Sequence, residues 1–197
     1  MAGAEPLPER IMTAAEFMDW DGGGMLGKLE LVHGIVRAMS PASGTHSLIQ
    51  ALIQANLCYL IGAHLRAKKL PCRVGTQAPV QPQMHANDNV RAPGLAVTCA
   101  PPSKSKIFPD PVLIIEVLSP SNQKDIWDSI YAMATIPALT EIAVVDNEAV
   151  RVEVFRLGPD GAWPKGGEVF EGGATVRLDS IGAELPVSEI YAGTIHA

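Results

Sequence analysis

The clearest candidate for chemistry in this sequence is Glu116, which stands near the end of a long apolar segment. Six of the seven residues from 112 to 118 are Val, Leu or Ile, a composition typical of a strand covered on both faces. An ionised carboxylate is tolerated in such a strand only beside a cation, a hydrogen-bond donor or a metal ion. Glu116 is therefore a candidate site residue. In the alternative interpretation, it lies just beyond the buried stretch and reaches solvent or caps the next turn.

The first half of the chain supplies elements that could place other side chains near Glu116. Thr13 and Glu16 have the spacing of a capping box and predict a short helix from 13 to about 20. A hairpin follows, with strands at 28–32 and 35–39, and Glu30 lies in the middle of its first strand. From Thr45 to about Ala67, apolar residues recur at helical spacing and predict the longest helix.

The second half of the chain is mostly strands separated by Gly- and Pro-rich turns. A helix is predicted from Asp125 to Ala134, after the central strand and before the next apolar strand. The other predicted strands cover 72–80, 90–99 with an interruption at Pro93 and Gly94, 141–145, 150–157, 168–171 and 174–178.

The composition favours a single soluble domain over 1–197, with residues 1–12 as a flexible arm. A net charge of −6 and a pI near 5.3 argue against a protein that coats nucleic acid or membranes nonspecifically. No signal peptide and no run of about 18 apolar residues is evident, so a cytoplasmic protein is expected. Cys58, Cys72 and Cys99 have no paired spacing, so they indicate neither a disulfide framework nor a zinc site.

Several short segments in a fixed order resemble the Uma-two family of putative restriction endonucleases, over roughly residues 13–191. They are Leu29–Gly34, Met39–Pro41, His46, Glu116–Ser121 and Ile142–Asp146. The resemblance implies the α/β fold of the PD-(D/E)XK nucleases, a restriction-endonuclease-like mixed central sheet flanked by helices. Additional antiparallel strands follow toward the C-terminus.

The resemblance also implies a reaction, the Mg²⁺- or Mn²⁺-dependent hydrolysis of DNA phosphodiesters. Magnesium prefers oxygen ligands, and neighbouring carboxylates can hold it beside water and phosphate. By motif, Glu30 and Glu116 match the two metal-binding glutamates of the family. His46 aligns with a family histidine that could donate to phosphate or order Glu30, although a polar contact at the helix start is an equal alternative.

Two positions depart from the family pattern, and both concern residues that catalysis uses in the family. Where the family has Pro-Asp, this chain has Pro93 followed by Gly94, which cannot bind a metal through a side chain. The usual lysine is also missing, because Leu118 stands two residues after Glu116 and Ser129 stands four residues after Asp125. Lys124 could fold back toward Glu116 as a replacement, while the alternative is a solvated surface lysine.

The aspartates nearest in sequence are too far away to replace the missing family Asp at residue 94. Asp88 and Asp110 each lie six residues upstream of Gly94 or Glu116, which is about 20 Å in an extended strand.

The leading hypothesis is therefore a DNA endonuclease with an impaired site, which forms a homodimer. The alternative is a noncatalytic nucleic-acid-binding or dimeric interaction module that retains the nuclease fold. A third interpretation, an acid–base pair of Glu30 and His46 acting on another substrate, has no supporting motif.

Overall fold

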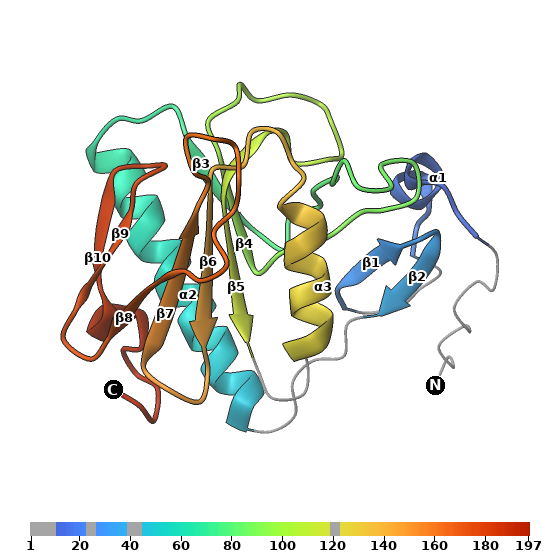
Figure 1. Ribbon diagram of the computed structural model, residues 1–197. Coiled ribbons are helices and arrows are strands. Elements are labelled where there is room, and N and C mark those ends of the chain that lie inside the picture. Colours follow the sequence, from blue (N-terminus) through green and yellow to red (C-terminus); the bar gives the residue numbers. More distant parts are fainter. Residues whose placement is uncertain (1–10, 23–26, 39–44, 119–122) are drawn as a thin grey trace.

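The centre of the molecule is a mixed six-stranded sheet in the order β3-β4-β5-β6-β7-β8 (Figure 1). The computed structural model describes residues 11–22, 27–38, 45–118 and 123–197. Within this sheet, β5 and β6 pair in parallel, and every other pair of neighbouring strands is antiparallel. The strands are β3 (Arg73–Thr76), β4 (Leu95–Thr98), β5 (Pro111–Leu118), β6 (Glu141–Asp146), β7 (Arg151–Arg156) and β8 (Glu168–Glu171).

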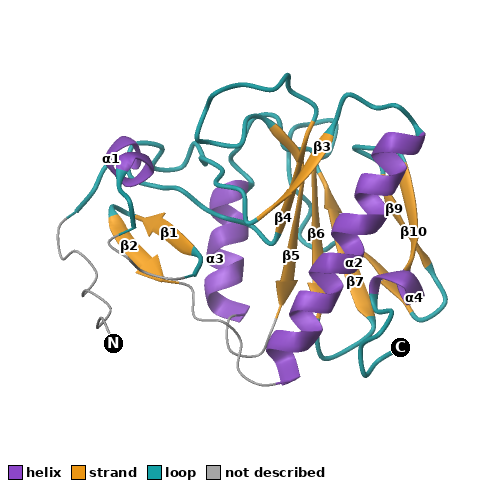
Figure 2. Cartoon of the chain, turned by 180° about the vertical axis from the view of Figure 1, so that it is seen from behind, coloured by secondary structure: helices purple, strands orange, loops and turns teal. Residues whose placement is uncertain are grey.

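Strand β5 is central because its side chains are apolar on both faces. Leu113, Ile115 and Val117 belong to the core on one face, which includes the buried side of α2 (Thr45–Ala67). Ile114 and Leu118 belong to the core on the other face, which includes α3 (Gln123–Met133). The two helices therefore cover opposite faces of the sheet (Figure 2). Because side chains alternate along a strand, Glu116 points to the α3 face.

The long helix begins and ends where the sequence predicts, at Thr45 and Ala67. It is long and apolar enough to cross a membrane by length and composition alone. Its buried stripe packs against the sheet, as expected of a core helix in a globular protein. That stripe consists of Ile49, Ile53, Leu57, Ile61 and Leu65.

The N-terminal part forms a small unit beside α3, seen in both ribbon views (Figures 1 and 2). It contains α1 (Ala14–Asp19) and the hairpin of β1 (Leu29–Val32) and β2 (Ile35–Ala38). The predicted capping box is confirmed, since the Thr13 hydroxyl accepts from the Glu16 amide and the Glu16 carboxylate accepts from the Thr13 amide. A bridge between Leu31 and Val90 joins this hairpin to the segment that leads into β4. The proposed arm at 1–12 falls mostly outside the described residues.

The C-terminal part adds a second hairpin and a short helix that the sequence does not predict in full. Strand β9 (Thr175–Leu178) was predicted, but β10 (Ala183–Pro186) and α4 (Val187–Ile190) were not. Both are only four residues long, and their apolar side chains pack into the core on the α2 face. Tertiary packing therefore determines these two elements, rather than a local pattern.

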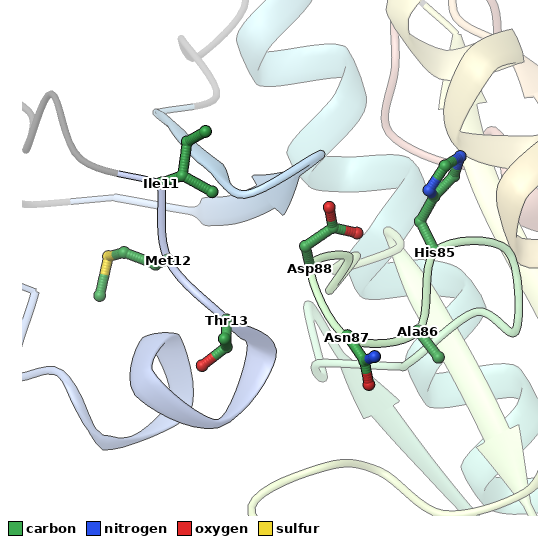
Figure 3. Close-up of a pocket in the computed structure, with 7 residues that line it drawn as sticks. All are labelled: Ile11, Met12, Thr13, His85, Ala86, Asn87 and Asp88. Carbon is green, nitrogen blue, oxygen red and sulfur yellow. The ribbon is translucent and has the colours of Figure 1, made fainter.

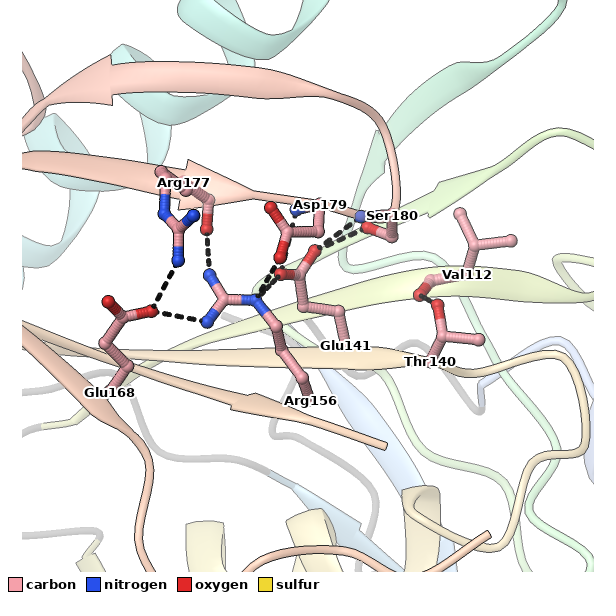
Figure 4. A network of polar contacts seen from close by, with 8 residues as sticks. All are labelled: Val112, Thr140, Glu141, Arg156, Glu168, Arg177, Asp179 and Ser180. Atoms are coloured by element: carbon pink, nitrogen blue, oxygen red, sulfur yellow. Dashed lines mark hydrogen bonds and ion pairs between the residues drawn. The ribbon is translucent and has the colours of Figure 1, made fainter. Parts of the chain in front are cut away.

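A buried carboxylate connects this second hairpin to the sheet (Figure 4). Glu141, at the start of β6, is 1% exposed and accepts hydrogen bonds from the amides of Asp179 and Ser180, each at 3.0 Å. The Nε of Arg156 lies 3.0 Å from the same carboxylate, and its guanidinium also pairs with Glu168. The network thus joins β6, β7 and β8 to the turn that follows β9.

The prediction of unpaired cysteines is wrong for two of the three. Cys72 and Cys99 form a disulfide, while Cys58 is free. The pairing of Arg73 with Thr98 in the antiparallel ladder places the flanking Cys72 and Cys99 opposite each other. The two cysteines are 27 residues apart in the sequence, and this spacing alone does not predict a disulfide. The register of the two strands brings them together.

Candidate active site

Glu30 is buried in the hairpin and held by three groups. It is 2% exposed, and its Oε1 accepts a hydrogen bond from the Ala92 amide at 3.0 Å. The Nζ of Lys28 lies 3.3 Å from Oε1, and a guanidinium nitrogen of Arg91 lies 3.5 Å from Oε2. Lys28 precedes Glu30 by two residues, so both side chains extend from the same side of the chain. The buried charge of Glu30 is therefore compensated by two cations.

Glu116 is equally enclosed and has a strongly perturbed titration. It is 4% exposed, and its Oε2 accepts a hydrogen bond from the Gly94 amide at 3.1 Å. Burial raises the pKa of Glu116 to about 7, and Lys28 opposes this shift more than any other charge. The negative charge of Glu30 raises the pKa further, while Arg91 lowers it. Glu116 therefore responds electrostatically to the same groups that contact Glu30.

The segment 92–94 brings the two glutamates together. Ala92 donates its amide to Glu30, and Gly94 donates its amide to Glu116. Two amides separated by two residues of extended chain are about 7 Å apart, so the two carboxylates approach the same short stretch of backbone. Two acidic residues that are far apart in the sequence thus share one buried site.

Gly94 stands where a third carboxylate would face this site. A Cβ at residue 94 would lie 3.5 Å from Oε2 of Glu116 and 3.1 Å from Nε2 of Gln54, which extends from α2. It would also lie 3.0 Å from the carbonyl oxygen of Ile115, so its neighbours would have to move by a few tenths of an ångström. A side chain added here would therefore point at Glu116 and into a tightly filled space.

The two other predicted site residues are His46 and Lys124. His46 is half-buried at the second residue of α2, and within the described part of the chain its Nδ1 has no hydrogen-bond partner. Lys124 is exposed on the first turn of α3. Among the largest electrostatic effects on the pKa of Glu116, the cations are Lys28 and Arg91.

Sequence reasoning missed both of these cations. Lys28 could have been found by its spacing, because a residue two before Glu30 in a strand shares its side of the sheet. Arg91 had no such local signal. It reaches Glu30 because Leu31 pairs with Val90, and Val80 pairs with Arg91 from the other side. Burial lowers the pKa of Arg91 and Glu30 opposes that shift, which marks their contact as a partly desolvated ion pair.

Helix α3 carries a serine at the position where the family pattern has a lysine. Ser129 is 3% exposed, and among the described residues its hydroxyl has no hydrogen-bond partner. It lies on the side of α3 that also buries Ile126, Ile130 and Met133 against the sheet. The preceding residue, Asp128, acts electrostatically on Arg91, so this part of α3 lies near the site.

The described donor set fits a divalent ion poorly. Mg²⁺ is usually held by carboxylates and keeps several water ligands. Here the two carboxylates are balanced by Lys28 and Arg91, and both oxygens of Glu30 already have partners. A metal ion would have to displace the Lys28 ammonium or the Arg91 guanidinium from Glu30. The site is closed, but it is charge-balanced rather than acidic.

Two of three comparisons with known proteins point to a nuclease family or fold. The family model described as "Uma2: Putative restriction endonuclease" matches residues 14–188. A solved structure, that of a putative nuclease from Anabaena variabilis, superposes with a TM-score of 0.68 at 19% sequence identity. The superposition covers 92% of this chain and 98% of the other, and at this identity the likeness shows the fold alone. No curated protein matches the sequence.

Proposed function

Since this chain belongs to the Uma-two family of putative restriction endonucleases, we propose that it is a DNA endonuclease homologue whose metal-dependent phosphodiester hydrolysis is impaired. The reaction would use Mg²⁺ or Mn²⁺, and the protein would act in the cytoplasm as a homodimer. The impairment lies in the exchange of one metal-binding carboxylate for Gly94 and in the neutralisation of the other two by buried cations.

The observation that carries this proposal is the convergence of Glu30 and Glu116 on the segment 92–94. A divalent ion bound there would neutralise phosphoryl charge and lower the pKa of a bound water. The nuclease family supports this use of the two carboxylates, and the missing Asp at residue 94 explains why the metal would bind weakly. Two oxygen ligands that are also ion-paired are a weak donor set for Mg²⁺.

Lys28 is the residue that we assign to the position of the missing lysine. Its ammonium lies 3.3 Å from Glu30 and is the charge with the largest effect on Glu116. A lysine at a nuclease site can position water or stabilise phosphoryl charge, and Lys28 is 17% exposed, so a small movement would bring it to solvent. The exposed Lys124 has no comparable contact with Glu116 within the described residues.

Restoring the third carboxylate tests the proposal. We expect Gly94→Asp to bind Mn²⁺ at least about tenfold more tightly than Gly94→Ala, as measured by calorimetry, because the added carboxylate would face Glu116. Gly94→Ala is the matched control, since it adds the same Cβ without a charge. Plasmid nicking by Gly94→Asp in Mn²⁺ should require Glu116 and be lost in the double variant with Glu116→Gln.

Two results would contradict the proposal. Robust cutting by the unaltered chain, abolished by Glu116→Gln, would overturn the impairment. Equal Mn²⁺ binding by Gly94→Asp and Gly94→Ala would overturn the assignment of the metal site. Thermal unfolding of both variants shows whether the tight contacts with Ile115 and Gln54 are tolerated. If neither folds, Mn²⁺ titration of the unaltered chain against Glu116→Gln decides the same question.

A noncatalytic nucleic-acid-binding or dimeric interaction module is the second candidate. The closed, charge-balanced pair of Glu30 and Glu116 favours it, because this state needs no metal. Lys106, in the loop before β5, pairs with Asp19 at 2.7 Å. DNA binding without metal that weakens steeply with salt would support the binding module. Analytical ultracentrifugation tests the dimer.

A further inference from the structure

A second group of ligand-type side chains lies outside the glutamate site. Among the described residues, His33, His85 and Asp88 form a group whose ligand atoms all lie within 4.8 Å of one another. His33 stands in the turn between β1 and β2, and the other two belong to the loop at 82–89. None of the three takes part in the contacts of Glu30 or Glu116 described above.

The backbone around this group is held by hydrogen bonds, not only by proximity. The amide of Gly34, next to His33, donates to the carbonyl of Asp88 at 2.8 Å. The amide of Asp88 donates to the carbonyl of His85 at 3.0 Å, which closes a turn with both side chains on it. Two further hydrogen bonds between Leu31 and Val90 continue the connection. The three ligand-bearing residues are therefore fixed relative to one another before anything binds.

The side chains already approach one another. The rings of His33 and His85 meet edge to face with their centroids 4.6 Å apart. In a tetrahedral site with metal–nitrogen distances near 2.1 Å, ligand atoms are about 3.4 Å apart. The ligand atoms of the three side chains lie within 4.8 Å of one another, so they need to move only slightly closer. Rotations of the side chains can bring this about, because both histidines are exposed and Asp88 is half-buried.

We propose that His33, His85 and Asp88 form a binding site for a borderline divalent transition metal, with Zn²⁺ as the reference ion. Two imidazoles and one carboxylate are a donor set suited to Zn²⁺, Co²⁺ or Ni²⁺ and unlike the all-oxygen sets of Mg²⁺. Three protein ligands leave a coordination position open. This site goes beyond the proposed nuclease function and depends on none of its residues.

A cavity lies beside two of the three proposed ligands. A pocket of about 360 Å³ lies between residues 11–13 and 85–88, and His85 and Asp88 are part of its wall (Figure 3). Ile11, Met12, Thr13, Ala86 and Asn87 complete the lining. With three protein ligands, a water or a small anionic ligand would complete the coordination, as in an open zinc site.

The experiment is a metal titration of the untagged protein in oxidising buffer. We expect one equivalent of Zn²⁺ to bind, and Co²⁺ to give the visible absorption of a four- or five-coordinate ion. His85→Asn and Asp88→Asn should each weaken Zn²⁺ binding by at least about a hundredfold. Asn suits residue 85 because it tolerates the left-handed backbone found there, with φ at 55°.

The chain offers matched controls for both the residue type and the proposed nuclease site. His64→Asn and His196→Asn remove histidines that bond to carbonyl oxygens elsewhere, and should leave Zn²⁺ affinity unchanged. Glu116→Gln should also leave it unchanged, which separates this proposal from the glutamate site. Absence of Zn²⁺ binding to the unaltered chain, or binding that survives both His85→Asn and Asp88→Asn, would overturn the proposal.

Discussion

At the scale of single residues, Glu116 gives the stability of the protein one specific dependence on pH. Its pKa in the folded state is about 7, raised by burial from an ordinary value of 4.5. The folded state therefore holds a proton on Glu116 between these values, whereas the unfolded state does not. A group of this kind makes folding less favourable as pH rises from about 4.5 through 7.

We predict that Glu116→Gln removes this pH dependence. Relative to the variant, the unaltered protein should lose up to about 3 kcal/mol of unfolding free energy between pH 4.5 and pH 8, from the shift in pKa. Urea denaturation of both proteins across this range measures the difference. Glu184→Gln, at an exposed position, is the control and should follow the unaltered protein. A pH-independent difference would show that Glu116 titrates normally.

The second prediction at this scale concerns the cation that faces the two glutamates. Lys28→Met should raise the pKa of Glu116 above its value of about 7, because Lys28 is the charge that lowers it most. Lys124→Met should have no such effect, since Lys124 is exposed on α3. NMR titration of the side-chain carboxyl carbons compares the two. Equal effects of the two variants would remove the basis for assigning Lys28 to the site.

At the scale of elements, the attachment of the β9–β10 hairpin depends on one buried carboxylate. Glu141→Gln leaves Arg156 facing an amide and disturbs the acceptor of two backbone amides. We predict a loss of about 3 kcal/mol of unfolding free energy, as when one partner of a buried pair is removed. Glu168→Gln, on the exposed side of the same arginine, should cost much less. Chemical denaturation of both variants decides; similar losses would contradict the central role of Glu141.

The disulfide between the ends of β3 and β4 is the second test at this scale. Its closed loop spans 27 residues, so reduction should lower the unfolding free energy by about 3 to 4 kcal/mol in the chain-entropy account. Denaturation with and without dithiothreitol measures this. The double variant Cys72→Ala with Cys99→Ala should be insensitive to the reductant, while Cys58→Ala should respond like the unaltered chain. Because disulfides are rare in the cytosol, a reducing cytoplasm would keep this pair as two thiols.

At the scale of the whole molecule, the elements with strong local signals were predictable. The apolar run of β5, the helical spacing of α2 and the capping box of α1 each carry their own pattern, and all three are confirmed. The mixed sheet with flanking helices is confirmed as well. The convergence of Glu30 and Glu116 was expected only through the family resemblance, because no local pattern links residues in different elements.

The parts that escaped prediction depend on contacts between distant segments. Arg91 reaches Glu30 only because residues 90 and 91 are bridged on both sides, to Leu31 and to Val80. The pairing of Cys72 with Cys99 follows from strand register, and β10 follows from packing against β9. Hydrophobic periodicity describes one segment at a time, so it contains no information about such neighbours.

The way the first hairpin is attached has a consequence for the integrity of the glutamate site. Glu30 lies on β1, which pairs with β2 and forms a bridge to Val90. Glu116 lies on β5, in the middle of the six-stranded sheet. A local opening that frees only the hairpin would separate the two carboxylates while the sheet stays intact. The site would then exist for the fraction of time that its smaller half is docked, and anything that secures the hairpin would also secure the site.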